Sequence, residues 1–479
     1  MDRLVICMKG DGTSSTFYVS LATETDIEGM PADIEEKNVL YTLQLDRKLI
    51  GADPQSAGDY LMNELCRHRA IEWAILQAIG RDHLVPIFLR VDPGGEAGDE
   101  IPWELLFNRK QRFLALSDRF PVVRSRQFMG KRNIERELIH PAGRRPEIRV
   151  LAILAAANAA WLYELRALEA AASAGADSGC DVRIQVLHCA TPADIRAEAD
   201  PGSGIQFAPF TDAGDLWNAV ERHRPNIIHF FCHGSVKNGP QLHCAKVLYA
   251  SVPDSRHMVN IAPDDIKGNL SADPHVWMVV LNACSTAKGM SAEARNSFAL
   301  QLLSVKVPLV IANRVPVEDC DASVMTRSLY PAVVKKVMGS LSNDHRVDWS
   351  DCLRSARLAL VREHLGELTE VEAAAQNDPW SRPVIYAVPY RFSLRGTEKP
   401  DPRSSARDEV REEANGQLRD VTQRFGPPVT GGSTPIASPD TTGGSGAARS
   451  ESWASYGVQA YSGLAEEDFA TGFAREDFI

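Results

Sequence analysis

Residues 226–235 read NIIHFFCHGS, and residues 275–286 read HVWMVVLNACST. Each stretch is a short apolar run of the kind that forms a strand buried on both faces, and each ends in a reactive side chain, His233 or Cys284. The carboxyl ends of neighbouring parallel strands meet at one edge of a sheet, where α/β proteins hold their ligands. We therefore expect His233 and Cys284 to lie side by side at such an edge.

A cysteine beside a histidine is the arrangement that nucleophilic catalysis by sulfur requires. A thiol of ordinary pKa is scarcely ionised at neutral pH, so Cys284 needs a base or a positive environment, and His233 supplies either. Gly234 lets the chain turn, and the backbone N–H groups of Gly234 and Cys284 can hold the oxyanion of a tetrahedral intermediate. A single Cys or His at a strand end is more often a packed core residue, so the prediction depends on the two occurring together.

The sequence around these stretches alternates between strand and helix patterns. Apolar runs lie at 148–155, 182–187, 227–232, 276–281 and 309–312, and helical spacing lies at 161–172, 216–222, 298–305, 322–337 and 351–365. This alternation predicts an α/β fold with a mostly parallel sheet flanked by helices. Beyond Leu394 the chain turns to Pro, Gly, Ser, Thr and charged residues, which predicts a disordered tail.

Length, charge and the first residues limit the class of protein. With 479 residues the chain exceeds what one core usually supports, which predicts two packed units before the tail. A net charge of −11 argues against a nucleic-acid partner, and the mixed-charge segment 131–149 is interpreted as an exposed connection between the units. No apolar run is long enough to span a membrane, and the start at Met1 lacks the pattern of a secretory signal, so we expect a cytoplasmic protein.

The cysteines and histidines raise the question of a metal. The 9 cysteines are scattered singly, so we expect reduced thiols, no disulfide framework and no cofactor. By composition alone, zinc could be bound by the cluster His229, Cys232, His233, His243 and Cys244. Strand alternation places Cys232 on the face opposite His229 and His233, so these side chains do not converge and we expect no metal site.

Further motifs follow one another in a recognisable order. They are PWELLF at 102–107, APDDI at 262–266, VPVEDCD at 315–321 with a helix ending at Tyr330, Ala356-Arg357, and Pro379-Trp380. Together with the H-G and N-A-C-S-T runs they resemble the CHAT peptidases, caspase-like proteins related to caspases and separase. Two departures are Val315, where that family often has Trp, and Ser285-Thr286-Ala287 after the cysteine.

The resemblance implies a domain organisation. It predicts a degenerate caspase-like subdomain at 1–140, a catalytic domain at 147–394 and a flexible tail at 395–479. It also implies a cysteine endopeptidase in a bacterial defence or cell-death system, held inactive until another protein engages it. The acidic and aromatic segment 450–479 is the predicted docking site for that partner, or an intramolecular plug.

The resemblance further implies a substrate preference. In separase-like relatives an acidic residue of the V-x-D segment binds a basic side chain before the scissile bond, and Asp319 holds the matching position. We therefore predict cleavage after Arg or Lys, through a charge-assisted contact. The alternative is that Asp319 caps the helix that begins near Cys320. Asp321 is the second candidate for the pocket, and Asn282 is a candidate for its floor.

Two other functions fit the same residues. The first is a catalytically silent caspase-like scaffold that acts by protein binding. The second is acyl transfer to, or hydrolysis of, a small molecule by the same dyad, because a fold does not fix its substrate.

Overall fold

The computed structural model describes residues 3–10, 16–21, 41–51, 53–92, 95–126, 133–140, 143–156, 161–190, 198, 203–235, 240–245, 258–270, 275–283, 297–304, 307–342, 345–366, 368–388 and 391–397. All of them belong to one compact unit, Met1–Ser405. The predicted tail lies outside the described residues from position 398 onward, as does Cys284.

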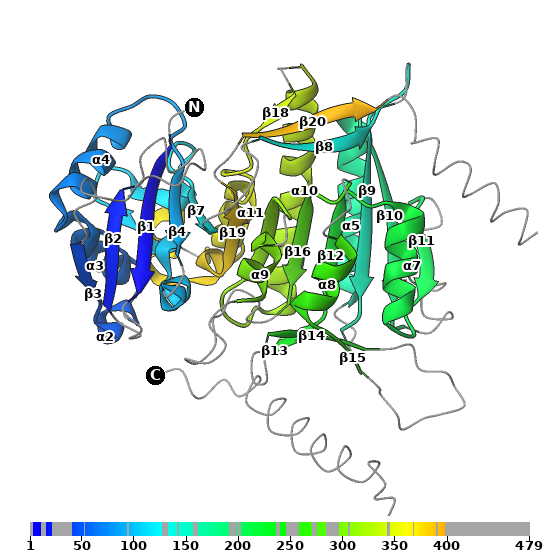
Figure 1. Ribbon diagram of the computed structural model, residues 1–479, viewed down its shortest axis with the longest axis horizontal. Helices are drawn as coiled ribbons and strands as arrows, with labels where there is room; N and C mark the ends of the chain where they lie inside the picture. Colours follow the sequence, from blue (N-terminus) through cyan, green and yellow to red (C-terminus); the bar gives the residue numbers. More distant parts are fainter. Residues whose placement is uncertain are drawn as a thin grey trace, which may run out of the picture. The chain divides into compact units, whose positions relative to one another are not determined.

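The strands that the sequence predicts around the two motifs form the middle of one large sheet (Figure 1). They are β9 (Glu147–Leu154), β10 (Asp181–His188), β12 (Ile227–Phe231), β16 (Met278–Asn282) and β17 (Leu309–Asn313). Two further strands of this part of the sheet, β11 (Gln206–Pro209) and β19 (Pro383–Ala387), were not predicted. Their order is β11-β10-β9-β12-β16-β17-β19, and only the β17–β19 pair is antiparallel. Every residue of β12, β16 and β17 is buried, which explains why these strands appear in the sequence as largely apolar runs.

Helices cover both faces of this part of the sheet (Figure 1). They are α5 (Trp161–Asp177), α7 (Ala213–His223), α8 (Pro263–Leu270), α9 (Phe298–Ser304), α10 (Asp319–Ser342), α11 (Arg354–Glu363) and α12 (Glu370–Gln376). The crossovers place α7, α8 and α9 on one face, while α5 packs with α10 on the other. The sequence-based prediction of an α/β fold with a mostly parallel, helix-flanked sheet is confirmed.

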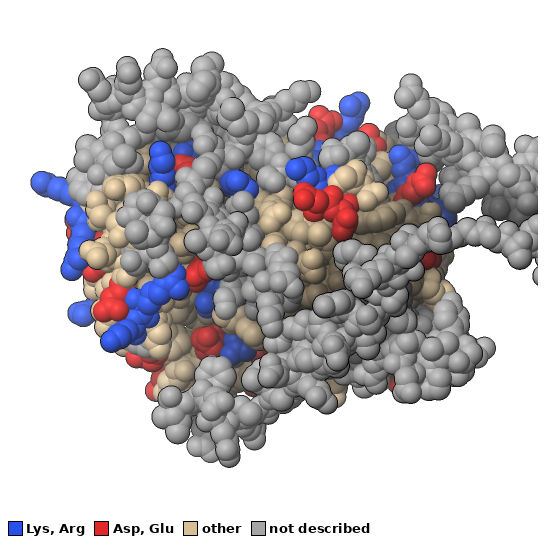
Figure 2. All heavy atoms as spheres, turned by 60° about the horizontal axis from the view of Figure 1, so that its bottom comes forward, with Lys and Arg blue, Asp and Glu red and all other residues tan. Residues whose placement is uncertain are grey.

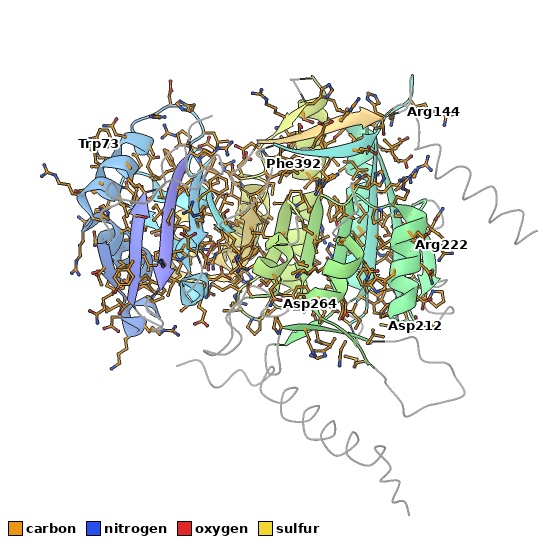
Figure 3. All side chains as sticks on the ribbon, viewed as in Figure 1. Trp73, Arg144, Asp212, Arg222, Asp264 and Phe392 are labelled. Atoms are coloured by element: carbon orange, nitrogen blue, oxygen red, sulfur yellow. The ribbon has the colours of Figure 1, made fainter. Side chains whose placement is uncertain are left out.

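The amino ends of α7 and α8 lie at the carboxyl edge of the strands (Figure 3). Asp212 caps α7 in a capping box with Asp215, and Arg222 lies in the last turn of the same helix, at its opposite end (Figure 3). Asp264, in the first turn of α8, lies at the same edge (Figure 3). The acidic first turns and the basic last turn match the helix dipole, which adds a positive end to the edge where β12 and β16 finish.

The sheet continues into the first part of the chain. Its strands there are β1 (Leu4–Gly10), β2 (Thr16–Leu21), β3 (Tyr41–Gln44), β4 (Ile87–Val91) and β7 (Val122–Arg126), covered by α2 (Arg47–Ile50), α3 (Pro54–Cys66) and α4 (Arg69–Ile79). The strands β1, β4 and β7 are parallel, and β7 joins β19 through one pair of Cα partners, Arg124 and Tyr386. The strands before and after residue 140 belong to this one sheet. The predicted division of the chain into two domains at residue 140 stays a prediction.

The mixed-charge segment differs from the prediction. Residues 133–139 form β8 (Asn133–Ile139), which pairs with β20 (Arg391–Thr397) and touches β9, and β20 pairs with β18 (Arg346–Val347). Ile134 and Leu138 are buried beneath its charged face, so this part of the segment is a half-buried strand and not an exposed connection. Its few apolar residues among many charges concealed the strand pattern.

The surface agrees with the mixed composition. On the face shown in Figure 2, the Lys and Arg side chains of the described residues are interspersed with Asp and Glu. No helix in the described ranges is long and apolar enough to cross a membrane.

Candidate active site

The two motif strands lie next to each other, as predicted. β12 and β16 pair in parallel, and their last residues, Phe231 and Asn282, are Cα partners. His233 follows Phe231 by two residues and begins β13 (His233–Ser235). Cys284 follows Asn282 by the same interval and lies outside the described residues. The register therefore brings the two chain segments out of the sheet at one level.

His233 belongs to a small sheet at this edge, formed by β13, β14 (Gln241–Ala245) and β15 (Met258–Ile261) (Figure 1). Its Cα partner in β14 is His243, whose Nδ1 lies 2.7 Å from Asn260 Oδ1. Burial lowers the pKa of His233, the charge of Asp319 opposes this, and the charge of His243 adds to it; the net direction is downward. The imidazole is therefore neutral near pH 7, the form in which it accepts a proton.

Asp319 is half-buried and is the first residue of α10. Its charge acts on His233, which links the start of α10 to the end of β12. The carbonyl of Glu318 accepts the N–H of Ala322, so Glu318 is at the cap position of α10. Asp319 lies one residue further, in the first turn, close to the position that the helix-cap alternative assigns to it. A carboxylate in a first turn is favourable toward the helix dipole, so helix stabilisation and substrate binding are compatible roles.

The other two pocket candidates are engaged inside the protein. Asp321 is 1% exposed, and its Oδ1 lies 2.8 Å from Nε2 of His364. Asn282 is 2% exposed; its Nδ2 donates to the carbonyl of Ala322 at 3.1 Å, and its Oδ1 accepts from Asn313 at 3.2 Å. Asp319 is thus the more accessible of the two acidic candidates.

The sequence matches the profile of the CHAT domain over residues 67–389, which is more than half of the chain. The chain belongs to the CHAT domain family. This is a family of caspase-like cysteine peptidases, and the matched residues include His233, Cys284 and Asp319. The resemblance found in the short motifs is confirmed by this match.

Solved structures similar to this CHAT protein include the Arg-specific cysteine proteinase gingipain R, at 10% identity and a TM-score of 0.38, covering 68% of each chain. The complex of the Porphyromonas gingivalis RgpB pro- and mature domains matches at 11% identity and 0.38, covering 68% of this chain and 71% of that one. The Saccharomyces cerevisiae separase in its complex with securin matches at 12% and 0.31, covering 79% of this chain and 21% of that one. No curated protein matches the sequence.

A buried polar network under the carboxyl edge of the CHAT domain escaped the sequence analysis. Glu164 of α5 is fully buried, accepts from Asn282 Nδ2 at 3.1 Å and from Thr326 Oγ1, and lies 2.8 Å from His229 Nε2. His229 Nδ1 is in turn 3.1 Å from the hydroxyl of Tyr330, whose pKa burial raises. A charged side chain is rarely buried unless it is paired, so these groups depend on one another.

One signal could have revealed Glu164. Trp161, Glu164, Leu165 and Leu168 share one face of α5, and all four are buried. An acidic residue within an apolar stripe of a helix indicates a buried polar partner elsewhere in the chain.

The same contacts bear on the cluster of His and Cys residues that could, by composition alone, bind zinc. His229 contacts Glu164 and Tyr330, whereas His243 contacts Asn260 in the small sheet. Within the described ranges no three His, Cys, Asp or Glu side chains are grouped as metal ligands would be.

Proposed function

We propose that this CHAT protein is a cysteine endopeptidase in which His233 is the base and Cys284 the nucleophile. The observation that carries the proposal is the register of β12 and β16, which ends the two motif strands at one level. Two residues span at most about 7 Å, so Cys284 stays close to Asn282 and His233 close to Phe231. Neighbouring strands are about 4.8 Å apart, so the chain segments that carry the two residues leave the sheet from adjacent strand ends.

The reaction follows from the chemistry of the pair. The Cys284 thiol gives its proton to the neutral imidazole of His233, and the sulfur attacks the scissile carbonyl carbon. The N–H groups of Gly234 and Cys284 stabilise the oxyanion of the tetrahedral intermediate. His233 then returns the proton to the leaving amine, and a water molecule, activated by the same imidazole, hydrolyses the thioester. The lowered pKa of His233 keeps the base unprotonated in the resting protein.

The substrate is proposed to carry Arg or Lys before the scissile bond. Asp319 supports this assignment for two reasons. Its charge raises the pKa of His233, and its side chain is half-buried, so it is not enclosed in the core. A guanidinium or ammonium group beside it would form a charge-assisted hydrogen bond. Asp321 and Asn282 remain secondary candidates, since each already has partners inside the protein.

Activation by a second protein in the cytoplasm, within a bacterial defence or cell-death system, completes the proposal. The acidic and aromatic segment 450–479 is the proposed docking site or plug. Deletion of this segment should change either peptidase activation or partner binding in a pull-down. Unchanged behaviour in both assays would remove the segment from the proposal.

The test is cleavage of a peptide library by the chain together with the proteins encoded beside it. The expected result is cleavage after Arg or Lys that disappears in Cys284→Ala and in His233→Ala and persists in Cys66→Ala, which removes a thiol of α3 instead. Preferred cleavage after Asp would contradict the basic pocket. A complete absence of cleavage in the activated complex would favour the silent scaffold.

A further inference from the structure

Three motifs that the candidate active site does not use meet at the end of β17. They are PWELLF, Ala356-Arg357 of α11, and Pro379-Trp380, which begins the short helix η4 (Pro379–Ser381). The chain passes from η4 into β19, whose first residue Pro383 is the Cα partner of Asn313, the last residue of β17. Arg357 donates to the carbonyl of the same Pro383 at 3.1 Å. Burial lowers the pKa of Arg357 and the charge of Glu104 in PWELLF opposes this, so Glu104 also lies near.

Four buried polar atoms at this place have no hydrogen-bond partner in the part of the chain that the structure describes. They are the Nε atoms of Arg314, Arg357 and Arg382 and the Oγ of Ser381. The backbone N–H of Arg314 donates to the carbonyl of Arg382 at 3.0 Å, so these two residues are neighbours, and Ser381 directly precedes Arg382. A buried donor without an acceptor is destabilising, so four such atoms in one place indicate that an acceptor binds there.

Arg314 is the least satisfied member of this group. It is half-buried, and its side chain makes no hydrogen bond or ion pair with any described residue. By contrast, a terminal nitrogen of Arg382 lies 3.1 Å from Asp378 Oδ1. Burial lowers the pKa of Arg314, and the charges of Glu104 and Asp378 oppose this without restoring it. Because a guanidinium stays protonated, Arg314 is a cation without a bound counter-ion.

The buried carboxylates nearby are already engaged. Both oxygens of Glu104 accept from Arg124, at 3.1 and 2.7 Å. Asp99 accepts from Arg124 at its Oδ1, at 3.0 Å, and from the hydroxyl of Ser297 at its Oδ2, at 2.8 Å. Arg124 is therefore neutralised twice, while Arg314 is left over, and one further negative charge would balance it.

We propose that Arg314, together with the unpartnered groups of Arg357, Arg382 and Ser381, binds a small oxyanion that carries one negative charge, of the size of a carboxylate group. The planar fork of a guanidinium binds two oxygens side by side, and the Ser381 hydroxyl adds a further donor. Arg357 and Ser381 are 1% and 0% exposed, whereas the Arg382 side chain is 22% exposed and Arg314 is half-buried, so the group reaches the surface at the latter two.

The position of this group agrees with a ligand site. Arg314 directly follows β17, which pairs in parallel with β16, so it lies at the carboxyl edge of the sheet, where α/β proteins hold their ligands. The oxyanion site goes beyond the proposed peptidase function, because it uses neither His233 nor Cys284.

The test measures binding of acetate, as the probe, to the full chain by equilibrium dialysis with radiolabelled acetate. The expected result is saturable binding of one acetate per chain. Thermal unfolding in acetate, compared with chloride at equal ionic strength, should show a rise in melting temperature of about 2 °C or more at saturation, because the ligand binds the folded state.

Two substitutions of Arg314 and one control assign the binding. Arg314→Met removes the cation and keeps most of the volume; it should weaken acetate binding by about tenfold or more and, without acetate, melt no lower than the parent. Arg314→Lys keeps the charge without the fork and should weaken binding by about fivefold. Arg144→Met removes an exposed arginine far from β19 and should bind acetate as the parent does (Figure 3).

Non-saturable binding in the parent, or an affinity within about twofold of the parent in the folded Arg314 variants, would identify an adventitious ion only and overturn the inference. A larger rise in melting temperature with phosphate than with acetate would overturn the assignment to a singly charged group. These measurements need no peptidase activity, so their outcome is independent of whether the protein cleaves a peptide.

Discussion

Replacing Glu164 by alanine should destabilise the protein strongly, whereas glutamine should be tolerated. In the alanine variant the buried hydroxyl of Thr326 loses its acceptor and His229 Nε2 loses the carboxylate oxygen 2.8 Å away, while Asn282 keeps its bond to the Ala322 carbonyl. Depriving a buried polar group of its partner costs about 1–3 kcal/mol, and two buried groups, Thr326 and His229, face the lost carboxylate. We expect a loss of about 3–5 kcal/mol for Glu164→Ala and about 1–2 kcal/mol for Glu164→Gln, which keeps the shape and one oxygen acceptor.

Urea unfolding of the full chain, followed by tryptophan fluorescence, measures both losses. Trp277 and Trp380 are fully buried and report on the core. Glu221→Ala, at an exposed position of α7, is the control and should change the free energy of unfolding by no more than about 0.5 kcal/mol. A loss below about 1 kcal/mol for Glu164→Ala, or equal losses for alanine and glutamine, would refute the view that Glu164 is the centre of the network.

Two further predictions concern specificity and packing. Asp319→Asn should lower kcat/KM for Arg substrates by about tenfold or more. The charge of Asp319 raises the pKa of His233 against the effect of burial. Removal of this charge should therefore also shift the acid limb of the pH profile of kcat/KM to lower pH. An unchanged acid limb together with unchanged selectivity would exclude Asp319 from the site. Gly58→Ala should lower the melting temperature, because the added Cβ would lie 2.0 Å from the Leu105 carbonyl oxygen. The control Gly268→Ala, in α8, should not lower it, because a Cβ there has nothing within 4 Å. Equal effects of the two substitutions would contradict this packing.

The strands that hold the candidate site were predictable because buried parallel strands leave a local record. The residues of β12 and β16 are all buried and mostly apolar, with His229 within β12 and Asn282 at the end of β16, and each run stops close to the residue where the chain leaves the sheet. The edge position of His233 followed from that stop alone. The parallel pairing of the two strands required only the alternation of strands and helices around them.

The polar contacts were not predictable in the same way. Glu164 meets Asn282 across 118 positions, and Asp99 meets Ser297 across 198, so no local spacing records either pair. The role of Asn282 illustrates the difference. Its place two residues before Cys284 suggested a pocket floor, whereas its side chain bonds to α5, α10 and Asn313 inside the core.

β8 shows a third case, in which charge concealed a strand. Ile134 and Leu138 of this strand are buried, and the surrounding Glu and Arg residues gave the segment the composition of an exposed linker. Its place in the sheet depends on β20, more than 250 positions later, which follows the end of the catalytic strands.

The central claim, that Cys284 is the nucleophile and His233 its base, is tested most directly by a peptidyl-arginine chloromethyl ketone added to the activated full chain, with intact-mass and peptide analysis of the adduct. The account predicts one adduct, on Cys284, that forms far more slowly in His233→Ala and at the parental rate in Cys66→Ala. An adduct on another cysteine, or equal labelling of Cys284 with and without His233, would contradict it.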